Sequence, residues 1–357
     1  MNAIRQFTVL SLIAGSIVFI TQTMASTPVK KDSPVINTLF AQTKPQCIGR
    51  YVIDVPVSFN NQLHDMIFID DFKIETKLLY PPAFKQRVQL REQELREATN
   101  KPGNRPENAP FLKDVILLPD GRGVIFDRNE SGVSDIYRKL EAHIYSDITA
   151  FVITTDIRDF SDGKHSEKKS KYLARGFTEV DTNTKPRKLA AMQSLISRLS
   201  GRKDENIPSA EGVCIPNGFI RDDGLVHKEE VSFSFKNSDF VFGFYTSNKY
   251  KGSDDTLFNR AAEVEKILKD TNQHTIKKYA LSPGGVPAQA WLSGGTQNVG
   301  NSVIPLYEFD LYANEADATP TKPWLTMGIG NNDKKTRYSE VQMIEIWDRL
   351  VNSLRYK

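Results

Sequence analysis

The chain carries the same order of predicted elements twice, and this repetition constrains the fold more than any other feature of the sequence. Each half starts with a strand that contains a cysteine and continues with a hairpin, a helix, a second hairpin, a strand pair and a closing helix. The predicted ranges are 47–56, 65–79, 82–99, 113–128, 136–157 and 185–199 in the first half, and 214–220, 230–246, 256–269, 275–292, 303–329 and 339–354 in the second.

This order indicates an α+β fold with two similarly built domains, each a mainly antiparallel sheet with packed helices. A chance similarity is the alternative, because antiparallel meanders with helices are common and the halves are not visibly identical in sequence. We expect a signal peptide over 1–25, a flexible lead-in over 26–46, an N-terminal domain over 47–202, a linker over 203–213 and a C-terminal domain over 214–357.

Composition narrows the functional classes. The chain has 357 residues, of which 39% are hydrophobic and 25% charged, as in folded proteins rather than disordered or collagen-like ones. Its formal net charge of +3 gives no electrostatic reason to bind nucleic acid. A length of this size fits two domains, at roughly 100–200 residues for each.

The N-terminus predicts export. Arg5 precedes a mostly apolar stretch over 7–20, and the small residues Thr23 and Ala25 follow it, which is the pattern of a secretory signal peptide cut after Ala25. An uncleaved anchor is the weaker alternative, because the apolar run falls short of the roughly 20 residues that a spanning helix needs. No cysteine follows the cut site, so lipid attachment is not supported. We therefore expect a periplasmic protein.

In an oxidising compartment the two cysteines, Cys47 and Cys214, are expected to pair. The bridge would close a very long loop and contribute on the order of 4–5 kcal/mol. Two separate buried thiols are the alternative. Because each cysteine opens one half of the chain, a bridge would fasten the two domains together near their first strands and leave a cleft between them.

No catalytic signature is found in the mature chain. A Gly-x-Ser-x-Gly elbow is absent, and the Ser-x-x-Lys match at Ser166 lies in a lysine-rich run without its companion motifs. Adjacent carboxylates fall at turns and helix starts, where aspartate is favoured locally. The histidines show no metal-ligand spacing, so we expect no catalytic, metal or cofactor site; they are His64, His143, His165, His227 and His274.

Two groups of residues are candidates for contact with a partner. A basic stretch is expected to be a solvated face, with a docking patch for an acidic partner as the alternative; it comprises Lys164, Lys168, Lys169, Lys171 and Arg175. Aromatic residues expected in loops could anchor a protein interface, although core or rim positions are the more ordinary outcome; they are Phe160, Tyr172, Tyr250 and Phe258.

Two sequence motifs carry a resemblance to a known family. The stretch Cys-Ile-Gly-Arg-Tyr-Val-Ile-Asp-Val-Pro over 47–56, with Cys-Ile-Pro-Asn-Gly-Phe-Ile over 214–220, resembles the immunity proteins that bacteria pair with type VI secretion phospholipase (lipase) effectors. The resemblance implies two α+β domains that form a claw in the periplasm, grip a toxic lipase and block its access to membrane lipid. It supplies no catalytic residues, and only the cysteines and their strands match residue by residue.

Export, two comparable lobes, one bridge and the missing catalytic signature agree with such a clamp. The leading hypothesis is therefore an immunity protein, not an enzyme, that binds and inhibits a cognate secreted phospholipase effector in the periplasm. One alternative is a periplasmic hydrolase whose dispersed catalytic triad uses His143 or His227. Another is a periplasmic small-molecule-binding protein with its ligand in the interdomain cleft. The toxin, the contact residues and the oligomeric state are not indicated by the sequence.

Overall fold

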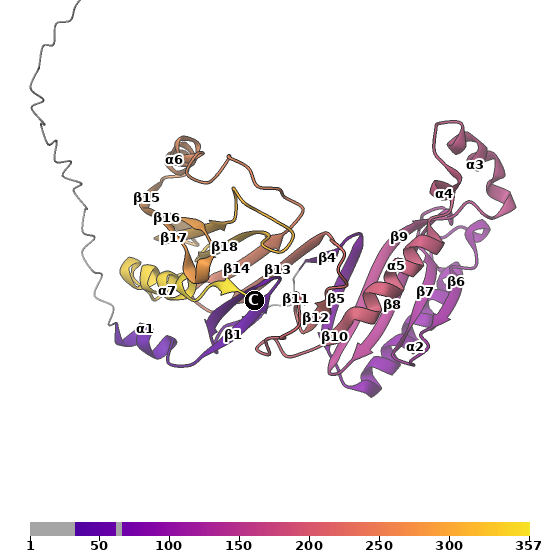
Figure 1. Cartoon of the computed structure of the whole chain (residues 1–357), viewed down its shortest axis with the longest axis horizontal. Coiled ribbons are helices and arrows are strands. Elements are labelled where there is room, and N and C mark those ends of the chain that lie inside the picture. The colour runs from indigo at the N-terminus through magenta and orange to yellow at the C-terminus, as the bar shows by residue number, and fades with distance from the viewer. Residues whose placement is uncertain (1–32, 62–65) are drawn as a thin grey trace, which may run out of the picture.

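The computed structural model describes residues 33–61 and 66–357. The predicted signal peptide and His64 lie outside the described residues. Within them the chain forms two lobes joined side by side, with two small sheets at the seam and the C-terminus beside them (Figure 1). The larger sheet has 13 strands in the described residues and runs through both lobes. This is the mainly antiparallel α+β architecture with packed helices that the sequence predicts.

The N-terminal lobe is built from antiparallel strands that neighbour each other in the order β4-β5-β9-β8-β7-β6. Its hairpins lie close to the ranges that the sequence predicts, and helices follow the second and sixth strands of the lobe. The elements are β4 (Ile67–Ile69), β5 (Phe72–Leu78), α2 (Pro81–Glu97), η1 (Ala98–Asn100), η2 (Pro106–Asn108), β6 (Leu112–Leu117), β7 (Gly123–Asn129), β8 (Tyr137–Ser146), β9 (Thr149–Arg158), η3 (Gly163–His165), α3 (Ser166–Leu173), α4 (Glu179–Thr182) and α5 (Lys185–Arg198).

The C-terminal lobe repeats this topology, with the order β13-β14-β18-β17-β16-β15. The position of each strand in the sheet matches that of its counterpart in the first lobe, and α6 and α7 occupy the places of α2 and α5 in the sequence of elements. The elements are β13 (Glu229–Lys236), β14 (Val241–Ser247), α6 (Ala261–Asp270), β15 (Gln273–Leu281), η4 (Pro283–Gly285), β16 (Ala288–Val299), β17 (Ser302–Ala313), β18 (Trp324–Gly330) and α7 (Glu340–Asn352).

The two lobes share one sheet because β4, the first strand of the N-terminal lobe, pairs with β13, the first strand of the C-terminal lobe. Strands β4 and β13 are antiparallel, with Ile67 opposite Val231 and Ile69 opposite Glu229; the short β3 (Asn60–Asn61) also pairs with β13. An antiparallel pair of equivalent strands relates the two lobes by an approximate two-fold rotation. The sheet hydrogen bonds therefore continue from one repeat into the other.

The last strand of each half of the chain also pairs with the opening hairpin of the other half; we call these halves the two repeats. The hairpin of β1 (Thr43–Ile48) and β2 (Tyr51–Pro56) pairs with β19 (Arg355–Tyr356), which ends the second repeat. The hairpin of β11 (Gly212–Ile215) and β12 (Gly218–Arg221) pairs with β10 (Leu199–Gly201), which ends the first. The spatial lobes are thus not the two continuous halves of the chain, because the opening hairpin of each half packs with the end of the other.

The helices cover the sheet in the way that their apolar faces dictate. In α7 the buried residues Met343, Ile346 and Trp347 recur at helical spacing and join the main core, as do Met192 and Leu195 of α5. Helices α2 and α6 each join a smaller cluster apart from this core: Leu95 of α2 lies in one with Phe126, and Leu268 of α6 in another with Trp291.

Several local expectations differ from the structure. The single strands expected over 47–56 and 214–220 are each part of a hairpin, β1 with β2 and β11 with β12. Residues 34–39 form α1 (Pro34–Leu39) and β1 begins at Thr43, so ordered structure starts inside the expected lead-in. Helix α6 begins at Ala261, not at Thr256; Leu257 is buried in the turn before it. The lysine-rich run beginning at Lys164 forms η3 and α3; α3 has no buried residue, which agrees with the expected solvated face. At α6 the spacing of Leu257 with Ala261 and Val264 continues the helical apolar pattern one turn before the true start, which explains that error.

Candidate partner-binding surface

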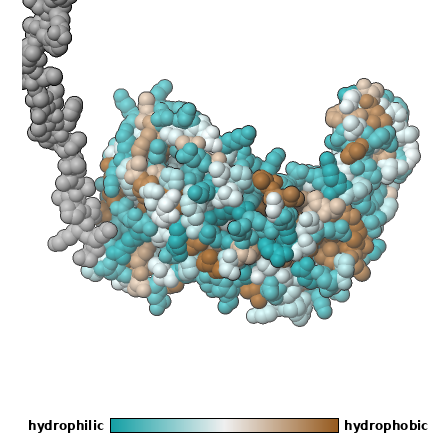
Figure 2. Space-filling view, viewed as in Figure 1, coloured by the Kyte–Doolittle hydropathy of each residue, from teal (hydrophilic) through white to brown (hydrophobic). Residues whose placement is uncertain are grey.

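One face of the molecule is hollowed between the two lobes (Figure 2). On one side it is bordered by a projection that carries α3 and α4, which we call the arm (residues 159–184). On the other side lies the loop that joins β14 to α6 in the C-terminal lobe (Figure 1). A surface of this shape can receive a protein rather than enclose a small substrate.

The base of the arm is held by a buried carboxylate. Asp135 is 3% exposed and accepts hydrogen bonds from Lys113 at 3.1 Å and from Lys164 at 2.7 Å, while Nε2 of His165 lies 2.9 Å from its other oxygen. Burial of Asp135 favours its neutral form, but the hydrogen bonds from Lys164 and Lys113 outweigh this and lower the pKa of Asp135 to about 2. The carboxylate therefore remains charged and fixes the start of the arm.

Aromatic stacking stiffens the outer part of the arm. The rings of Tyr172 and Phe177 are parallel, with centroids 3.9 Å apart, and Phe160 lies 5.4 Å from Tyr172 on the inner side. The Arg158 guanidinium lies 4.8 Å from the centre of the Tyr172 ring, within cation–π range. Phe177 is 44% exposed and Val180 60% exposed, so the arm presents apolar surface to solvent.

The C-terminal lobe presents a second aromatic cluster. The ring of Trp324 lies 5.8 Å from Tyr245, 5.1 Å from Tyr250 and 6.1 Å from Tyr312. Tyr250 is 54% exposed, in the loop after β14. Burial, and then a hydrogen bond to Glu230, raises the pKa of Tyr245, so its phenol stays neutral and donates to that carboxylate. Such clusters of tyrosine and tryptophan are typical anchors of protein interfaces.

The seam between the lobes is fixed by covalent and ionic contacts. Cys47 and Cys214 form a disulfide, the pairing that the sequence predicts. Arg50 donates to Asp222 at 2.9 Å and to Glu229 at 2.6 Å, which joins the first hairpin to the second repeat. Burial alone would lower the pKa of Arg50, but these carboxylates outweigh it and raise that pKa. This rigid seam therefore sets the distance between the arm and the C-terminal lobe across the hollow.

The hydrogen bonds of Arg202 complete this seam. Its guanidinium donates to the carbonyl oxygens of Cys47 at 2.9 Å and Gly218 at 2.9 Å, and it is 8% exposed. Burial lowers the pKa of Arg202. One side chain thus satisfies backbone acceptors from both opening hairpins.

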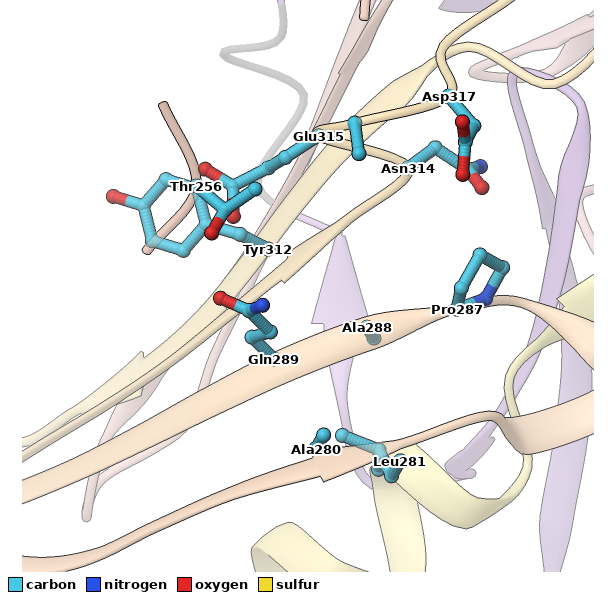
Figure 3. A pocket seen from close by; sticks show the side chains of 11 residues that line it. Thr256, Ala280, Leu281, Pro287, Ala288, Gln289, Tyr312, Asn314, Glu315 and Asp317 are labelled. Atoms are coloured by element: carbon cyan, nitrogen blue, oxygen red, sulfur yellow. The ribbon is translucent and has the colours of Figure 1, made fainter. Parts of the chain in front are cut away.

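A separate cavity of about 220 Å³ lies in the C-terminal lobe (Figure 3). It is bordered by the end of β15, the start of β16 and the end of β17, so it is not the interdomain cleft in which the small-molecule hypothesis places a ligand. Two of its polar side chains are already used: Glu315 accepts from the backbone of Leu257, and Gln289 from that of Phe258. These contacts hold the loop before α6.

Comparison with known families decides what kind of protein this is. The model of the Tle cognate immunity protein 4 N-terminal domain matches residues 44–202, and that of the Tle cognate immunity protein 4 C-terminal domain matches residues 206–357. The chain belongs to the Tle cognate immunity protein 4 family. Its members are immunity proteins rather than enzymes, and they act in the periplasm. Comparison with curated proteins gave no match.

Solved structures of immunity proteins share the fold of this family member. The apo structure of the immunity protein TplEi of the type VI secretion system (T6SS) of Pseudomonas aeruginosa is 20% identical, with a TM-score of 0.65, and the match covers 88% of this chain and 97% of that one. A crystal structure of a Tle4–Tli4 complex is 19% identical with a TM-score of 0.64, covering 88% and 98%. TplEi complexed with an "L" peptide is 19% identical with a TM-score of 0.60, covering 88% and 98%.

In this Tle cognate immunity protein 4 family member, the two histidines that a hydrolase would use make structural contacts. His143 lies 2.8 Å from Glu141, and His227 lies between Asp70 at 2.7 Å and Asp223 at 3.1 Å. Neither is hydrogen-bonded to a serine hydroxyl among the residues that the structure describes, and those residues contain no group of histidine, cysteine and acidic side chains able to hold a metal ion. No helix in the described ranges is both long and apolar enough to cross a bilayer.

The aromatic residues selected from the sequence lie in three places: on the arm, in the exposed loop after β14, and packed inside the C-terminal lobe. Phe160 is 5% exposed, and Tyr172 lies on a helix rather than in a loop. Tyr250 is exposed, whereas Phe258 packs 6.4 Å from Trp291. Sequence reasoning missed Trp324, which lies at the first position of β18; the concentration of aromatic residues around it comes from strands and loops far apart in the chain.

Proposed function

We propose that the chain binds and inhibits a cognate type VI secreted phospholipase effector in the periplasm, and so protects the producing cell and its sister cells. The observation that carries the proposal is the match of both immunity domains, in order, over residues 44–202 and 206–357. The described fold supports it, because two lobes of equal topology border one hollow.

The rigid seam explains how such a protein would inhibit without chemistry. A stable complex buries on the order of 1,200–2,000 Å² of total surface, and fixed walls avoid the entropy of ordering loops on binding. The exposed aromatic side chains Phe177 on the arm and Tyr250 on the opposite lobe would anchor the effector from two sides. Held in this way, the effector would be kept from membrane lipid.

Export is part of the proposal. We propose that residues 1–25 are a signal peptide, cut after Ala25, that delivers the chain to the periplasm. The disulfide between Cys47 and Cys214 supports this, because such bonds form and persist in oxidising compartments. We also propose that the units of the chain are 47–202 and 214–357, joined by 203–213; the boundary between the two family matches falls within this linker.

The decisive experiment mixes the purified chain starting at Ser26 with the lipase encoded beside its gene. We expect one stable complex on size-exclusion chromatography and loss of phospholipid hydrolysis at an equimolar ratio. An unrelated periplasmic lipase is the control and should keep its activity. Failure to form the complex, with the lipase remaining active, would refute the proposal.

A further inference from the structure

A cavity of about 320 Å³ lies between the arm and the start of β8. Its floor is apolar: Ile136 is 2% exposed and Phe160 5% exposed, and the ring of Tyr172 adjoins them. The residues around this floor are polar or cationic, namely Ser134, Tyr137, Lys168, Lys171 and Arg175. The cavity therefore combines an aromatic base with a cationic rim.

Two of the three cations on this rim have no acidic partner in the described part of the chain. None of the residues lining the cavity is acidic. Lys171 is paired with Glu167 on the outer surface of α3, where both side chains are at least 70% exposed. Over the described ranges, Lys168 and Arg175 form no ion pair. Of the five Lys or Arg residues in 164–175, three have acidic partners: Lys164 pairs with Asp135, Lys169 with Glu179 and Lys171 with Glu167. The excess positive charge at the opening therefore comes from Lys168 and Arg175.

The cavity is preformed. Its Tyr172 wall is held by the stacked Phe177 ring and by the Arg158 guanidinium. Helix α3 is tied to α4 by an ion pair of 2.7 Å between Lys169 and Glu179, and Phe160 donates its backbone N–H to the carbonyl of Thr182. A ligand would therefore meet a formed pocket and would not have to order the arm.

We infer that this cavity receives an acidic segment of the effector, in which one apolar or aromatic side chain enters the pocket and adjacent aspartate or glutamate side chains meet Lys168 and Arg175. The inference rests on the proposed function and adds the chemistry of the contact. The apolar floor matches a hydrophobic side chain, and the unneutralised cations match carboxylates in both charge and hydrogen-bonding capacity.

The shape of the site favours a protein segment over a lipid surface. Peripheral membrane binding uses apolar side chains that project outward into the headgroup layer. Here the apolar groups Ile136 and Phe160 lie at the bottom of a concave site, out of reach of a flat bilayer, while the cations stand around the opening. Interface anchors, in contrast, insert into pockets of this kind.

The test reverses the charge of the rim. In the Lys168→Glu/Arg175→Glu variant, effector affinity should fall at least tenfold, mainly through slower association at low salt. The matched control is Lys85→Glu/Arg87→Glu on α2, which changes the same charges at exposed positions away from the arm and should stay within twofold of the wild type. Circular dichroism and thermal melting verify that both variants are folded.

The outcomes separate this inference from the proposed function. If the wild type binds the effector and the rim variant binds equally well, the inference is overturned while the proposed function stands. If the wild type does not bind, the proposed function fails. A third experiment uses vesicles containing phosphatidylglycerol. If the wild type floats with these vesicles and the rim variant does not, the cavity binds lipid headgroups and the inference is overturned.

Discussion

Cys47 and Cys214 occupy equivalent positions in the two repeats, each one residue before the end of the first strand of its hairpin, and they are bonded to each other. Their partners across the hairpins, Val52 and Phe219, pack against them in one small cluster. The disulfide thus lies close to the approximate two-fold axis, at the place where each repeat receives the last strand of the other.

Removal of this disulfide should lower the free energy of unfolding but leave the protein folded. The cysteines are 167 residues apart, and the chain-entropy model gives a loss of about 5 kcal/mol for the Cys47→Ser/Cys214→Ser variant. Strand exchange and the Arg50 ion pairs remain, so the variant should still fold. Urea unfolding of wild type and variant measures the difference. A variant as stable as the wild type would show that the bridge constrains nothing in the unfolded chain.

Strand exchange makes a second prediction, about the continuity of the chain. A protease site inserted at 205–207, an exposed stretch between β10 and β11, would allow the two halves to be separated covalently. After cleavage and reduction of the disulfide, we expect both fragments to elute together in a 1:1 complex, because each holds a strand and a hairpin that complete the other. The uncut, reduced chain is the control. Fragments that separate without denaturant would contradict the interlocked arrangement.

The repeated order of elements could be predicted from the sequence because each helix and hairpin has its own local pattern. Met192 and Leu195, for example, lie at helical spacing, and Asp147 occupies a two-residue turn with positive φ. The exchanged strands could not be predicted: Leu199–Gly201 and Arg355–Tyr356 are too short to show a period of two. The pairing of Ile67 with Val231 is equally invisible, because it joins residues far apart in the chain.

For the candidate site, the sequence predicted which kinds of residue could contact a partner, but not how they are arranged. The basic stretch that includes Lys168 and Arg175 was identified from charge, but its helix was not, because Ser166–Leu173 has no buried residue to mark an inner face. Tyr250 was selected as an aromatic residue expected in a loop. Its contact with Trp324 depends on β14 and β18 lying next to each other in the sheet, which only the tertiary structure shows.

The Asp135 cluster at the base of the arm predicts a defined pH dependence. The pKa of Asp135 is about 2, lower than the ordinary value of 3.8, so the folded state binds the proton of this carboxyl less tightly than the unfolded state does. The contribution is therefore fully present above pH 4 and is lost as the pH falls toward 2. Asp135→Asn should cost about 2 kcal/mol at pH 7, and the difference from wild type should shrink across that acidic range.

The control for Asp135 is Asp156→Asn. The Asp156 side chain is 81% exposed and forms an ion pair with Lys139 at the surface, so its loss should change stability by less than about 1 kcal/mol at any pH. Denaturant unfolding at pH 7, 4 and 2.5 provides the comparison. Equal effects of the two substitutions at pH 7 would mean that the buried cluster does not stabilise the arm.

The aromatic cluster of the C-terminal lobe makes the last prediction, which concerns effector binding. Tyr250 is 54% exposed, and its ring lies 5.1 Å from that of Trp324, so Tyr250→Ala removes exposed interface area without opening the core. We expect about a tenfold weaker affinity for the effector, equivalent to about 1.4 kcal/mol, with an unchanged melting temperature. Leu117→Ala is the matched control, because Leu117 is 75% exposed on the edge strand β6, outside both walls. Isothermal titration calorimetry measures the affinity of both variants for the effector. If Tyr250→Ala binds as tightly as Leu117→Ala, the aromatic cluster of the C-terminal lobe does not contact the effector.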